Sequence, residues 1–357
     1  MSGPLAGLRV VEFASIGPGP HAAMLLADMG ADVLRIDRDG GNGWPNPIVD
    51  RGRATKVVDI RDPEGRDWCR DAALRADVVI EGFRPGVMER LGLGPEVLCD
   101  MNPRLVYGRI TGWGQEGPLA RTAGHDINFI ALTGALAAIG QPGEPATVPL
   151  NLVGDFGGGS MFLVFGILAA LWEREKSGLG QVVDAAIVDG VASLMTMFTG
   201  LTPSGRISLD RAKNLLGGAT PFYRCYVCRD GREVAVGPLE PPFFAEMMER
   251  LGLSDLTAAQ YDESRWGELA GALAAAFASR EQAHWTEVFA GSDSCVAPVI
   301  IADEAPLHPH HVARGTYVEA DGLAQAAPAP RLSRTAGTIR PAGDADAMLS
   351  KWGRQRV

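Results

Sequence analysis

The amino-acid sequence predicts an α/β protein, with a Rossmann-like, doubly wound parallel sheet in a large domain and a smaller α+β domain. Strand and helix patterns alternate over the first 110 residues, which is typical of parallel βαβ units. The chain has 357 residues, and this length suggests about two domains at ~150 residues each. Hydrophobic residues make up 46% and charged residues 21%, as in ordinary globular proteins, so a disordered chain is excluded.

Five short hydrophobic runs in the first part of the chain are predicted to be strands: residues 8–13, 32–37, 56–59, 78–80 and 105–110. After the first strand, a Gly-Pro-Gly-Pro turn at 17–20 leads into a helix, with Pro20 suited to a first helical position, and this helix stops near Gly30. Asp62 is a good N-cap for a further helix that begins at Pro63. These elements are expected to form the doubly wound sheet.

The rest of the chain predicts fewer strands. Residues 111–160 are rich in glycine and turns, and helical patterns cover 160–176 and 182–198. Strands are expected at 225–228 and 233–236, followed by helices that start near 242, after a capping box of Ser279 and Gln282, and at 344. We therefore expect a large domain over 1–200 completed by 315–357, a connector over 201–220 and a small α+β domain over 221–314.

Charge and cysteine content restrict the possible partners. A formal net charge of −10 gives no overall attraction for nucleic acid or an anionic membrane. Of the 33 basic residues four are lysines, which leaves 29 arginines, so an anion site would use arginine and the genome is expected to be a GC-rich bacterial one. Five scattered cysteines and an N-terminus without signal-peptide features indicate a cytoplasmic protein. The twelve-residue apolar run at 161–172 is too short for a bilayer and predicts a buried helix.

The first candidate site resembles a dinucleotide fingerprint. Gly17-x-Gly19-x-x-Ala22 follows a strand and opens a helix, and Asp37 lies twenty residues later. However, Pro18 and Pro20 remove amide donors that a pyrophosphate would need. NAD binding therefore stays a minor alternative at this point.

Three further segments carry polar groups near glycine. Arg84, in the turn at 81–86, could hold a phosphate or be an ordinary surface arginine, and the glycine-rich run at 111–118 could be a ligand-binding or a plain loop. His125 and Asp155 lie in glycine-flanked segments, the second just before an apolar helix; they could act as acid and base, or be a core histidine and an N-capping aspartate. The Cys225-x-x-Cys228 pair has no partner pair for zinc and is interpreted as strand cysteines, so no metal site is predicted.

Several long motifs, taken together, resemble a known family. They are GPLAGLRVVE at 3–12, GADVLRID at 30–37, EGFRPG at 81–86, TGWGQEGP at 111–118, AGHDIN at 123–128 and GDFGGGS at 154–160. In this order they resemble the α-methylacyl-CoA racemases of the family III CoA-transferase (CaiB/BaiF) superfamily, over essentially the whole chain from Leu5 to about Thr335. The resemblance implies that the first βαβ unit holds the nucleotide end of coenzyme A rather than NAD.

The resemblance also implies which residues contact coenzyme A. The expected contacts are the following residues: Ile16, Arg38, Val58, Gly82, Phe83, Arg84 and Gly86. Basic residues at 51–56 correspond to a basic segment of the family, although the spacing differs and no phosphate is assigned to any of them. The acidic chain would then hold the anionic ligand with a few fixed arginines, Arg38 and Arg84 first among them.

The activity implied is a racemase or epimerase that interconverts (R)- and (S)-2-methylacyl-CoA through an enolate. By similarity, His125 serves one face of the α-carbon and Asp155 the other, and Glu240 helps to orient the histidine, with Asp126 as a further member of that network. From the residues alone, we expect the Gly157–Gly159 turn to contact the enolate oxygen. The resemblance further implies an interlocked homodimer in which Glu240 comes from either subunit, a role in lipid metabolism, and no cofactor, because coenzyme A is part of the substrate.

Other functions stay open at this point. The main alternative is a family III CoA-transferase that uses Asp155 as a nucleophile, and the others are a noncatalytic CoA-binding homologue and the NAD oxidoreductase. The sequence does not identify the acyl chain: branched fatty acyl, sterol side-chain and aryl-propionyl thioesters are all compatible with it. The expected partners are the acyl-CoA substrate and a second copy of the chain, with no nucleic acid or membrane.

Overall fold

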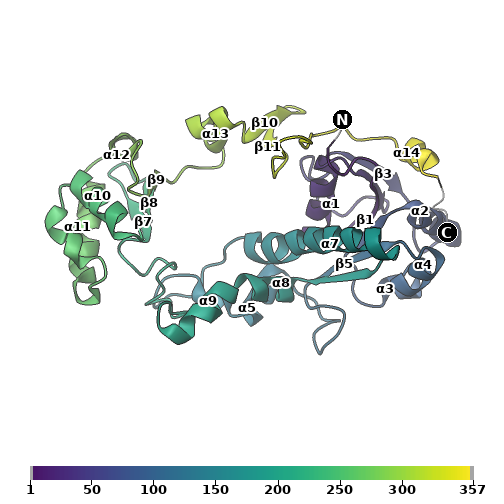
Figure 1. Cartoon of the computed structure of the whole chain (residues 1–357), viewed down its shortest axis with the longest axis horizontal. Coiled ribbons are helices and arrows are strands. Elements are labelled where there is room, and N and C mark those ends of the chain that lie inside the picture. The colour runs from purple at the N-terminus through teal and green to yellow at the C-terminus, as the bar shows by residue number, and fades with distance from the viewer. Residues whose placement is uncertain (1–2, 354–357) are drawn as a thin grey trace. The chain divides into compact units, whose positions relative to one another are not determined.

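A computed structural model describes residues 3–353 and divides the chain into two compact units. The large unit consists of the chain up to Thr133, Pro149–Leu194 and the segment from His310 onward, and the small unit consists of Gly134–Val148 and Met195–Pro309. We expected the change from the large to the small domain near residue 200, and the expected small domain did not include the segment Gly134–Val148. Figure 1 shows the elements of both units.

The large unit is built on a six-stranded parallel sheet with the strand order β3-β2-β1-β4-β5-β6. The strands are β1 (Arg9–Phe13), β2 (Asp32–Asp37), β3 (Arg53–Val57), β4 (Val78–Glu81), β5 (Val106–Thr111) and β6 (Val182–Ala186). Val11 of β1 pairs with Leu34 on one side and Val79 on the other, and all three side chains are fully buried. The sheet confirms the doubly wound prediction, because the strand order reverses between β1 and β4.

Several helices of the large unit begin at a proline or a capping side chain that the sequence shows. The helices of this unit are α1 (Pro18–Asp28), α2 (Pro63–Arg75), α3 (Val87–Arg90), α4 (Pro95–Met101), α5 (Asp126–Leu132), α7 (Met161–Ser177), α8 (Ile187–Leu194), α13 (Pro309–Arg314) and α14 (Ala345–Lys351). Asp62 caps α2 by accepting a hydrogen bond from the Gly65 amide, as predicted. The first helix begins at Pro18, two residues before the predicted position.

Two predictions between residues 150 and 200 are wrong. Residues 182–198 do not form one helix, because Val182–Ala186 is the edge strand β6, paired with β5, and helix α8 begins only at Ile187. The segment Leu152–Ser160 forms a π-helix, η1, that continues directly into α7, so Gly157–Gly159 is not a turn. A π-helix opens the backbone spacing and is frequent at functional sites.

Helix α7 is buried on one face only. Leu163, Ile167 and Ala170 lie in the interior, and the helix packs against β5, β6 and α1 (Figure 1). Phe165 and Trp172 on the other face are 70% and 69% exposed. The continuous stretch Leu152–Ser177 is long and apolar enough to cross a membrane by length and composition. The predicted buried helix is therefore buried on one face, because it has two apolar faces and the chain covers one.

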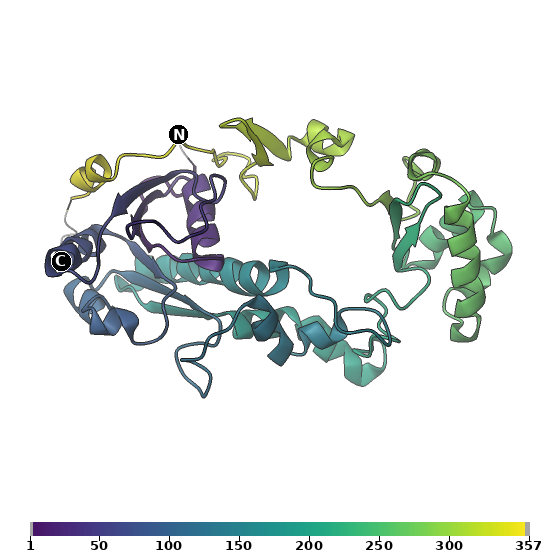
Figure 2. The same ribbon diagram turned by 180° about the vertical axis from the view of Figure 1, so that it is seen from behind.

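The C-terminal segment returns to the large unit. It contains β10 (Tyr317–Ala320), paired with β11 (Leu323–Ala326), and α14, which packs against β2 and β3 (Figure 2). The buried Arg51 guanidinium joins Asp28 of α1 to the Gln325 amide of β11, at 2.7 Å from the Gln325 oxygen. Through Arg51 and α14, the C-terminal segment is therefore attached to α1 and to strands β2 and β3.

The small unit combines a three-stranded antiparallel sheet, in the order β7-β8-β9, with a helical layer. Its elements are α6 (Ala135–Ala138), α9 (Thr196–Leu201), η2 (Thr202–Ser204), β7 (Arg224–Val227), β8 (Glu233–Val236), α10 (Pro241–Arg250), η3 (Ser254–Ala259), η4 (Glu263–Arg265), α11 (Trp266–Ala278), α12 (Gln282–Phe289), β9 (Val296–Pro298) and η5 (Ala305–Leu307). The predicted strands at 225–228 and 233–236 are confirmed. The predicted capping box is wrong, since α12 is preceded by Glu281 rather than Ser279.

Candidate active site

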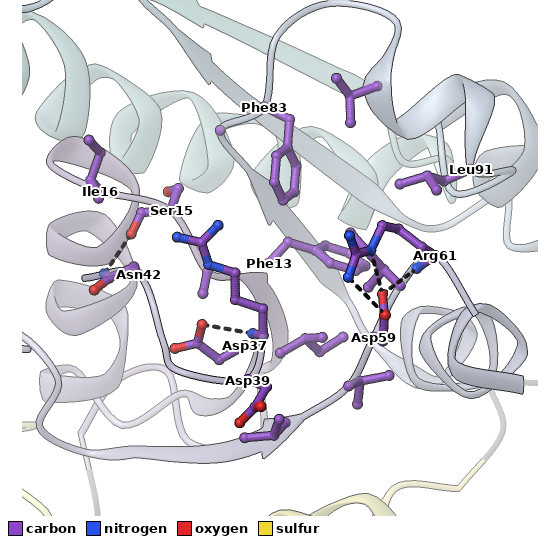
Figure 3. A pocket seen from close by; sticks show the side chains of 18 of the residues that line it. Phe13, Ser15, Ile16, Asp37, Asp39, Asn42, Asp59, Arg61, Phe83 and Leu91 are labelled. Atoms are coloured by element: carbon purple, nitrogen blue, oxygen red, sulfur yellow. Dashed lines mark hydrogen bonds and ion pairs between the residues drawn. The ribbon is translucent and has the colours of Figure 1, made fainter. Parts of the chain in front are cut away.

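A large cavity opens at the carboxyl ends of the central strands, where the strand order reverses. Its volume is about 910 Å³. Its walls come from the segments after β1, β2, β3 and β4 and from α3, and include Phe13, Ser15, Ile16, Arg38, Val58, Arg61, Gly82, Phe83, Arg90 and Leu91 (Figure 3). This is the position at which open parallel sheets bind nucleotides. We call it the large cavity.

The large cavity carries arginines in an otherwise acidic protein. Arg38 donates through Nε to the Gly41 carbonyl at 2.8 Å, and Arg61 pairs with Asp59 at 3.0 Å. Arg90 from α3 also lines the cavity. Three aspartates, Asp37, Asp39 and Asp59, line the same cavity, so its acidic and basic side chains are equal in number. Within this lining, the planar guanidinium groups are the ones suited to two-point contacts with a phosphate.

Five of the seven predicted coenzyme A contacts line the large cavity: Ile16, Arg38, Val58, Gly82 and Phe83. Arg84 and Gly86 do not line either described cavity. Gly86 has a φ of +85° and begins α3, and a Cβ added there would lie 3.2 Å from Nη1 of Arg90. Glycine at this position therefore leaves room for the Arg90 side chain.

A buried ionic cluster fixes the turn that carries Phe83. The Phe83 amide donates to Oε2 of Glu81 at 2.7 Å, and Oε1 of Glu81 accepts from Nε of Arg109 at 2.8 Å. Arg109 also pairs with Glu89 of α3 at 2.8 Å. Burial raises the pKa of Glu81, while the Phe83 amide and Arg109 oppose this rise. The cluster holds the turn and α3 together as one wall of the large cavity.

A second cavity of about 470 Å³ adjoins the first. Four residues line both cavities: Ser15, Ile16, Asn42 and Gly82. The smaller cavity is lined further by Gly17, Trp44, Asn46, Asp50, Ile110, Gly112, Gly124, His125, Phe129, Asn151, Asp155, Phe156 and Ile187. His125 and Asp155, which are 30 positions apart in the sequence, therefore line one space that continues into the large cavity.

His125 stands at the start of α5. Its amide donates to Oδ1 of Asn128 at 3.0 Å, which fixes the backbone of the histidine at the helix start. The Phe129 ring packs edge to face against the Trp113 ring, and the two ring centroids are 4.8 Å apart. A Cβ added to Gly112 would lie 2.0 Å from this ring, and one added to Gly124 would lie 2.6 Å away. The packing of Phe129 therefore requires glycine both at 124, immediately before His125, and at 112.

Asp155 lies in the first turn of the π-helix η1. Its amide donates to Oδ2 of the buried Asp126 at 2.7 Å, and its own Oδ2 accepts from Nδ2 of Asn151 at 3.2 Å. Burial raises the pKa of Asp155, the negative charge of Asp126 adds to this, and the Asn151 amide and the His125 charge oppose it. A raised pKa suits a carboxyl group that must both accept and deliver a proton.

Asp126 contacts the backbone of Asp155, and this contact was not expected from the sequence. A Cβ added to Gly154 would lie 2.3 Å from Oδ2 of Asp126, so glycine at 154 allows the contact. Gly158 and Gly159 are buried against α8 and α1, and none of Gly157–Gly159 lines the smaller cavity. The prediction that these glycines contact an enolate oxygen is not supported.

Glu240 belongs to the small unit. It is the N-cap residue of α10, and Pro241 and Pro242, which follow it in the chain, start the helix. Burial raises the pKa of Tyr261, and the Glu240 charge adds to the rise. Glu240 and the pair of His125 and Asp155 therefore lie in different units.

The arginines at 51 and 53 have structural partners. Nη1 of Arg53 lies 2.5 Å from Oε2 of Glu12, and both side chains are fully buried. Cys225 lies on β7, Cys228 follows it, and both are free thiols, as predicted. Among residues 3–353, no group of three or more His, Cys, Asp or Glu side chains is placed to hold a metal ion.

Comparison with known proteins gives consistent matches over nearly the whole chain. The sequence profile described as "CoA-transferase family III" matches residues 5–343. Two proteins named alpha-methylacyl-CoA racemase are similar: the one from Mus musculus is 43% identical over 93% of this chain and 87% of its own length, and the one from Homo sapiens is 42% identical over the same shares. A succinyl-CoA–D-citramalate CoA-transferase from Chloroflexus aurantiacus is 33% identical over 71% of this chain and 66% of its own.

A solved structure supports the fold. The crystal structure of a CaiB/BaiF family protein from Brucella suis superposes with a TM-score of 0.81 and 25% sequence identity, covering 98% of each chain. The six-stranded parallel sheet with small antiparallel sheets therefore matches the fold of a solved CaiB/BaiF protein.

Proposed function

Since the chain belongs to CoA-transferase family III, we propose that it is a 2-methylacyl-CoA racemase or epimerase. Enzymes of this family use no cofactor beyond the CoA-thioester substrate. The observation that carries the proposal is the joint position of His125 and Asp155 on one cavity that continues into the arginine-lined large cavity. The names of the two relatives at 43% and 42% identity support the same activity.

In the proposed reaction, the nucleotide end of coenzyme A occupies the large cavity and the thioester enters the smaller one. One of His125 and Asp155 removes the α-proton, and the electron pair of the C–H bond enters the enolate. The other group then delivers a proton to the opposite face, which inverts the α-carbon. Each well-placed acid or base contributes about 10²–10⁴-fold to such a rate.

Asp126 and Asn151 support this reaction through Asp155. The hydrogen bond from the Asp155 amide to Asp126 ties the first turn of η1 to the start of α5, which also carries His125. The two reactive groups are thereby held by neighbouring backbone segments. Such fixed spacing is what a two-base mechanism needs, because both groups must reach one carbon atom.

We further propose that the working enzyme is a homodimer in which Glu240 of one copy helps to orient His125 of the other. The exposed face of α7 supports this, since Met161, Phe165, Leu168 and Trp172 form one apolar stripe at helical spacing. A stripe of large apolar side chains on a helix is typical of a surface that another protein covers. A second copy of the chain is the proposed partner.

The proposal is tested by deuterium incorporation. Purified enzyme is incubated with (R)-2-methylacyl-CoA in D₂O, and mass spectrometry and chiral separation follow the α-position. The expected result is α-deuterium together with formation of the (S)-epimer. Absence of α-deuterium would exclude the racemase activity.

The second candidate is a CoA-transferase, which the match to a CoA-transferase at 33% identity supports. There Asp155 would attack the thioester carbonyl, and coenzyme A would leave as a thiolate while a mixed anhydride forms. Hydroxylamine would then cleave the anhydride and leave a hydroxamate on Asp155, and CoA would be exchanged only with an acceptor acid present. Neither result is expected for the racemase.

A further inference from the structure

The two oxygens of Asp155 have different surroundings. Oδ2 accepts a hydrogen bond from Nδ2 of Asn151 at 3.2 Å. The same oxygen lies against Gly17, where an added Cβ would be 3.1 Å from it. Within residues 3–353, no hydrogen bond to Oδ1 is present. One oxygen is therefore held by the protein, and the other is left for the substrate.

We infer that Asn151 is a positioning residue that holds Oδ2 of Asp155, so that Oδ1 is the atom that exchanges the proton with the α-carbon. This inference rests on the proposed racemase function and adds a residue to it. Asn151 lies three residues before the GDFGGGS motif at 154–160, and no role was expected for its side chain from the sequence.

The backbone at Asn151 supports a positioning role. Its carbonyl oxygen accepts from the Phe156 amide at 3.3 Å, so the residue joins the first turn of η1 through its main chain while its side chain holds Asp155 four positions later. Asn151 also lines the smaller cavity beside Asp155. Rotation of the Asp155 carboxyl group would therefore break the contact to Asn151.

The charges around Asp155 give this contact a measurable effect. Asp126 on α5 and His125 before it act on the carboxyl group with opposite signs. Helices α1 and α8 and strand β6 also pack on η1. Helix α1 carries His21, whose Nδ1 is hydrogen-bonded to Oγ of Ser160 at 2.6 Å. Helix α8 carries Asp189, and β6 carries Asp184. The Asn151 amide is a neutral donor that stabilises the ionised carboxylate and lowers its pKa.

The test compares Asn151→Ala and Asn151→Asp with the wild type. The reaction requires one proton on the pair of His125 and Asp155, so kcat/KM falls as the pH drops through the pKa of Asp155. Loss of the donor raises this pKa and moves the acidic limb of the pH profile to higher pH. Asn151→Asp, which has nearly the same shape but adds a negative charge, moves the limb further. At the optimum, kcat/KM falls about tenfold, the loss expected for one hydrogen bond to a charged group.

The control variant is Leu152→Ala, which alters the neighbouring exposed side chain of the same helix start. We expect Leu152→Ala to leave the acidic limb of the pH profile of kcat/KM at its wild-type position. In both variants of Asn151 the limb moves equally for the (R)- and (S)-substrates, because the equilibrium constant fixes the ratio of the two values of kcat/KM. A lowered rate with an unmoved limb would mean that Asn151 is merely structural, and would overturn the inference.

A measurement without turnover separates this inference from the proposed function. Carboxyl ¹³C NMR of aspartate-labelled protein identifies the Asp155 signal as the one missing in Asp155→Asn. Its titration midpoint is expected at higher pH in Asn151→Ala than in the wild type, and an equal midpoint would overturn the inference. Absence of α-proton exchange in the wild type would instead count against the racemase function.

Discussion

At the scale of single residues, the site depends on glycines that leave room for the reactive side chains as much as on those side chains themselves. Gly17 is the clearest case, because it has a φ of +70° and lies against the Asp155 carboxyl group. The sequence singled out this glycine for its resemblance to a dinucleotide fingerprint. In the structure Gly17 lines the smaller cavity beside Asp155, the proposed base, and this contact was not predicted.

Replacement of Gly17 tests this role. Gly17→Ala places a Cβ 3.1 Å from Oδ2 of Asp155. It also forces alanine into a backbone conformation with φ +70° and ψ −117°, which costs about 1–3 kcal/mol. We expect kcat to fall at least about tenfold, while inhibition by free coenzyme A changes little. Steady-state kinetics measure both values.

Gly7→Ala is the matched control. Gly7 also has a positive φ, of +90°, but an added Cβ would meet no atom within 4 Å. A positive-φ substitution without the contact is expected to leave kcat unchanged. A loss of kcat equal to that of Gly17→Ala would show that backbone strain alone explains the effect.

Other residues show where prediction from the sequence ended. His125 and Asp155 were identified by their glycine-rich motifs, and the structure places both on one cavity. Arg61 and Arg90 of the large cavity were missed, because the chain has many arginines and only the folded structure shows which of them line the cavity. A position just after a predicted strand, as for Arg61, was the one available signal.

At the scale of elements, the parallel sheet was predictable because its strands are short apolar runs separated by capped helices. The segment at 150–200 was not, since Val182–Ala186 is followed at once by α8 and its residues continue the apolar pattern of that helix. The π-helix was also hidden: Gly-Gly-Gly is typical of a turn. In the structure, close packing against α8 requires the central glycine, because a Cβ added to Gly158 would lie 2.6 Å from Cγ2 of Val191.

The first and third strands are joined by a buried ion pair whose removal we expect to be costly. Glu12→Gln leaves the guanidinium of Arg53 with only the partly exposed Asp50, 2.7 Å away, as a charged partner. Breaking a buried pair in this way costs about 3–5 kcal/mol of unfolding free energy. Urea denaturation followed by circular dichroism measures this change.

Two further variants define the origin of that cost. The double variant Glu12→Leu with Arg53→Met removes both charges and is expected to lose less stability than Glu12→Gln alone. Asp67→Asn, which breaks the exposed pair with Arg70, is expected to leave the unfolding free energy nearly unchanged. If Glu12→Gln behaved like Asp67→Asn, the buried pair would not be an important contact between β1 and β3.

At the scale of the whole molecule, the chain has two units whose order in the sequence is interleaved. The sequence located the small α+β unit from residue 221, because its strands and amphipathic helices have clear patterns. It did not assign Gly134–Val148 to that unit, since this stretch contains only turns and a four-residue helix. Contacts between distant segments, rather than local patterns, decide such assignments.

The exposed face of α7 leads to a prediction about assembly. Phe165→Glu places a charge in the middle of the apolar stripe and is expected to convert the proposed dimer into a monomer. Analytical ultracentrifugation measures the mass of the particle. Glu173→Lys, an exposed change on the same helix outside the stripe, is expected to leave the dimer intact. A monomeric wild type, or binding of the wild type to lipid vesicles through this face, would contradict the dimer.

The central claim is that two different groups serve the two faces of one carbon, and isotope exchange with single epimers tests it most directly. In D₂O, we predict that His125→Ala exchanges the α-proton of one epimer through Asp155 without forming the other epimer. We predict that Asp155→Asn does the same with the opposite epimer, and that racemisation is at least about 10²-fold slower in both. Exchange of the same epimer by both variants, or racemisation at the wild-type rate in either, would contradict the account.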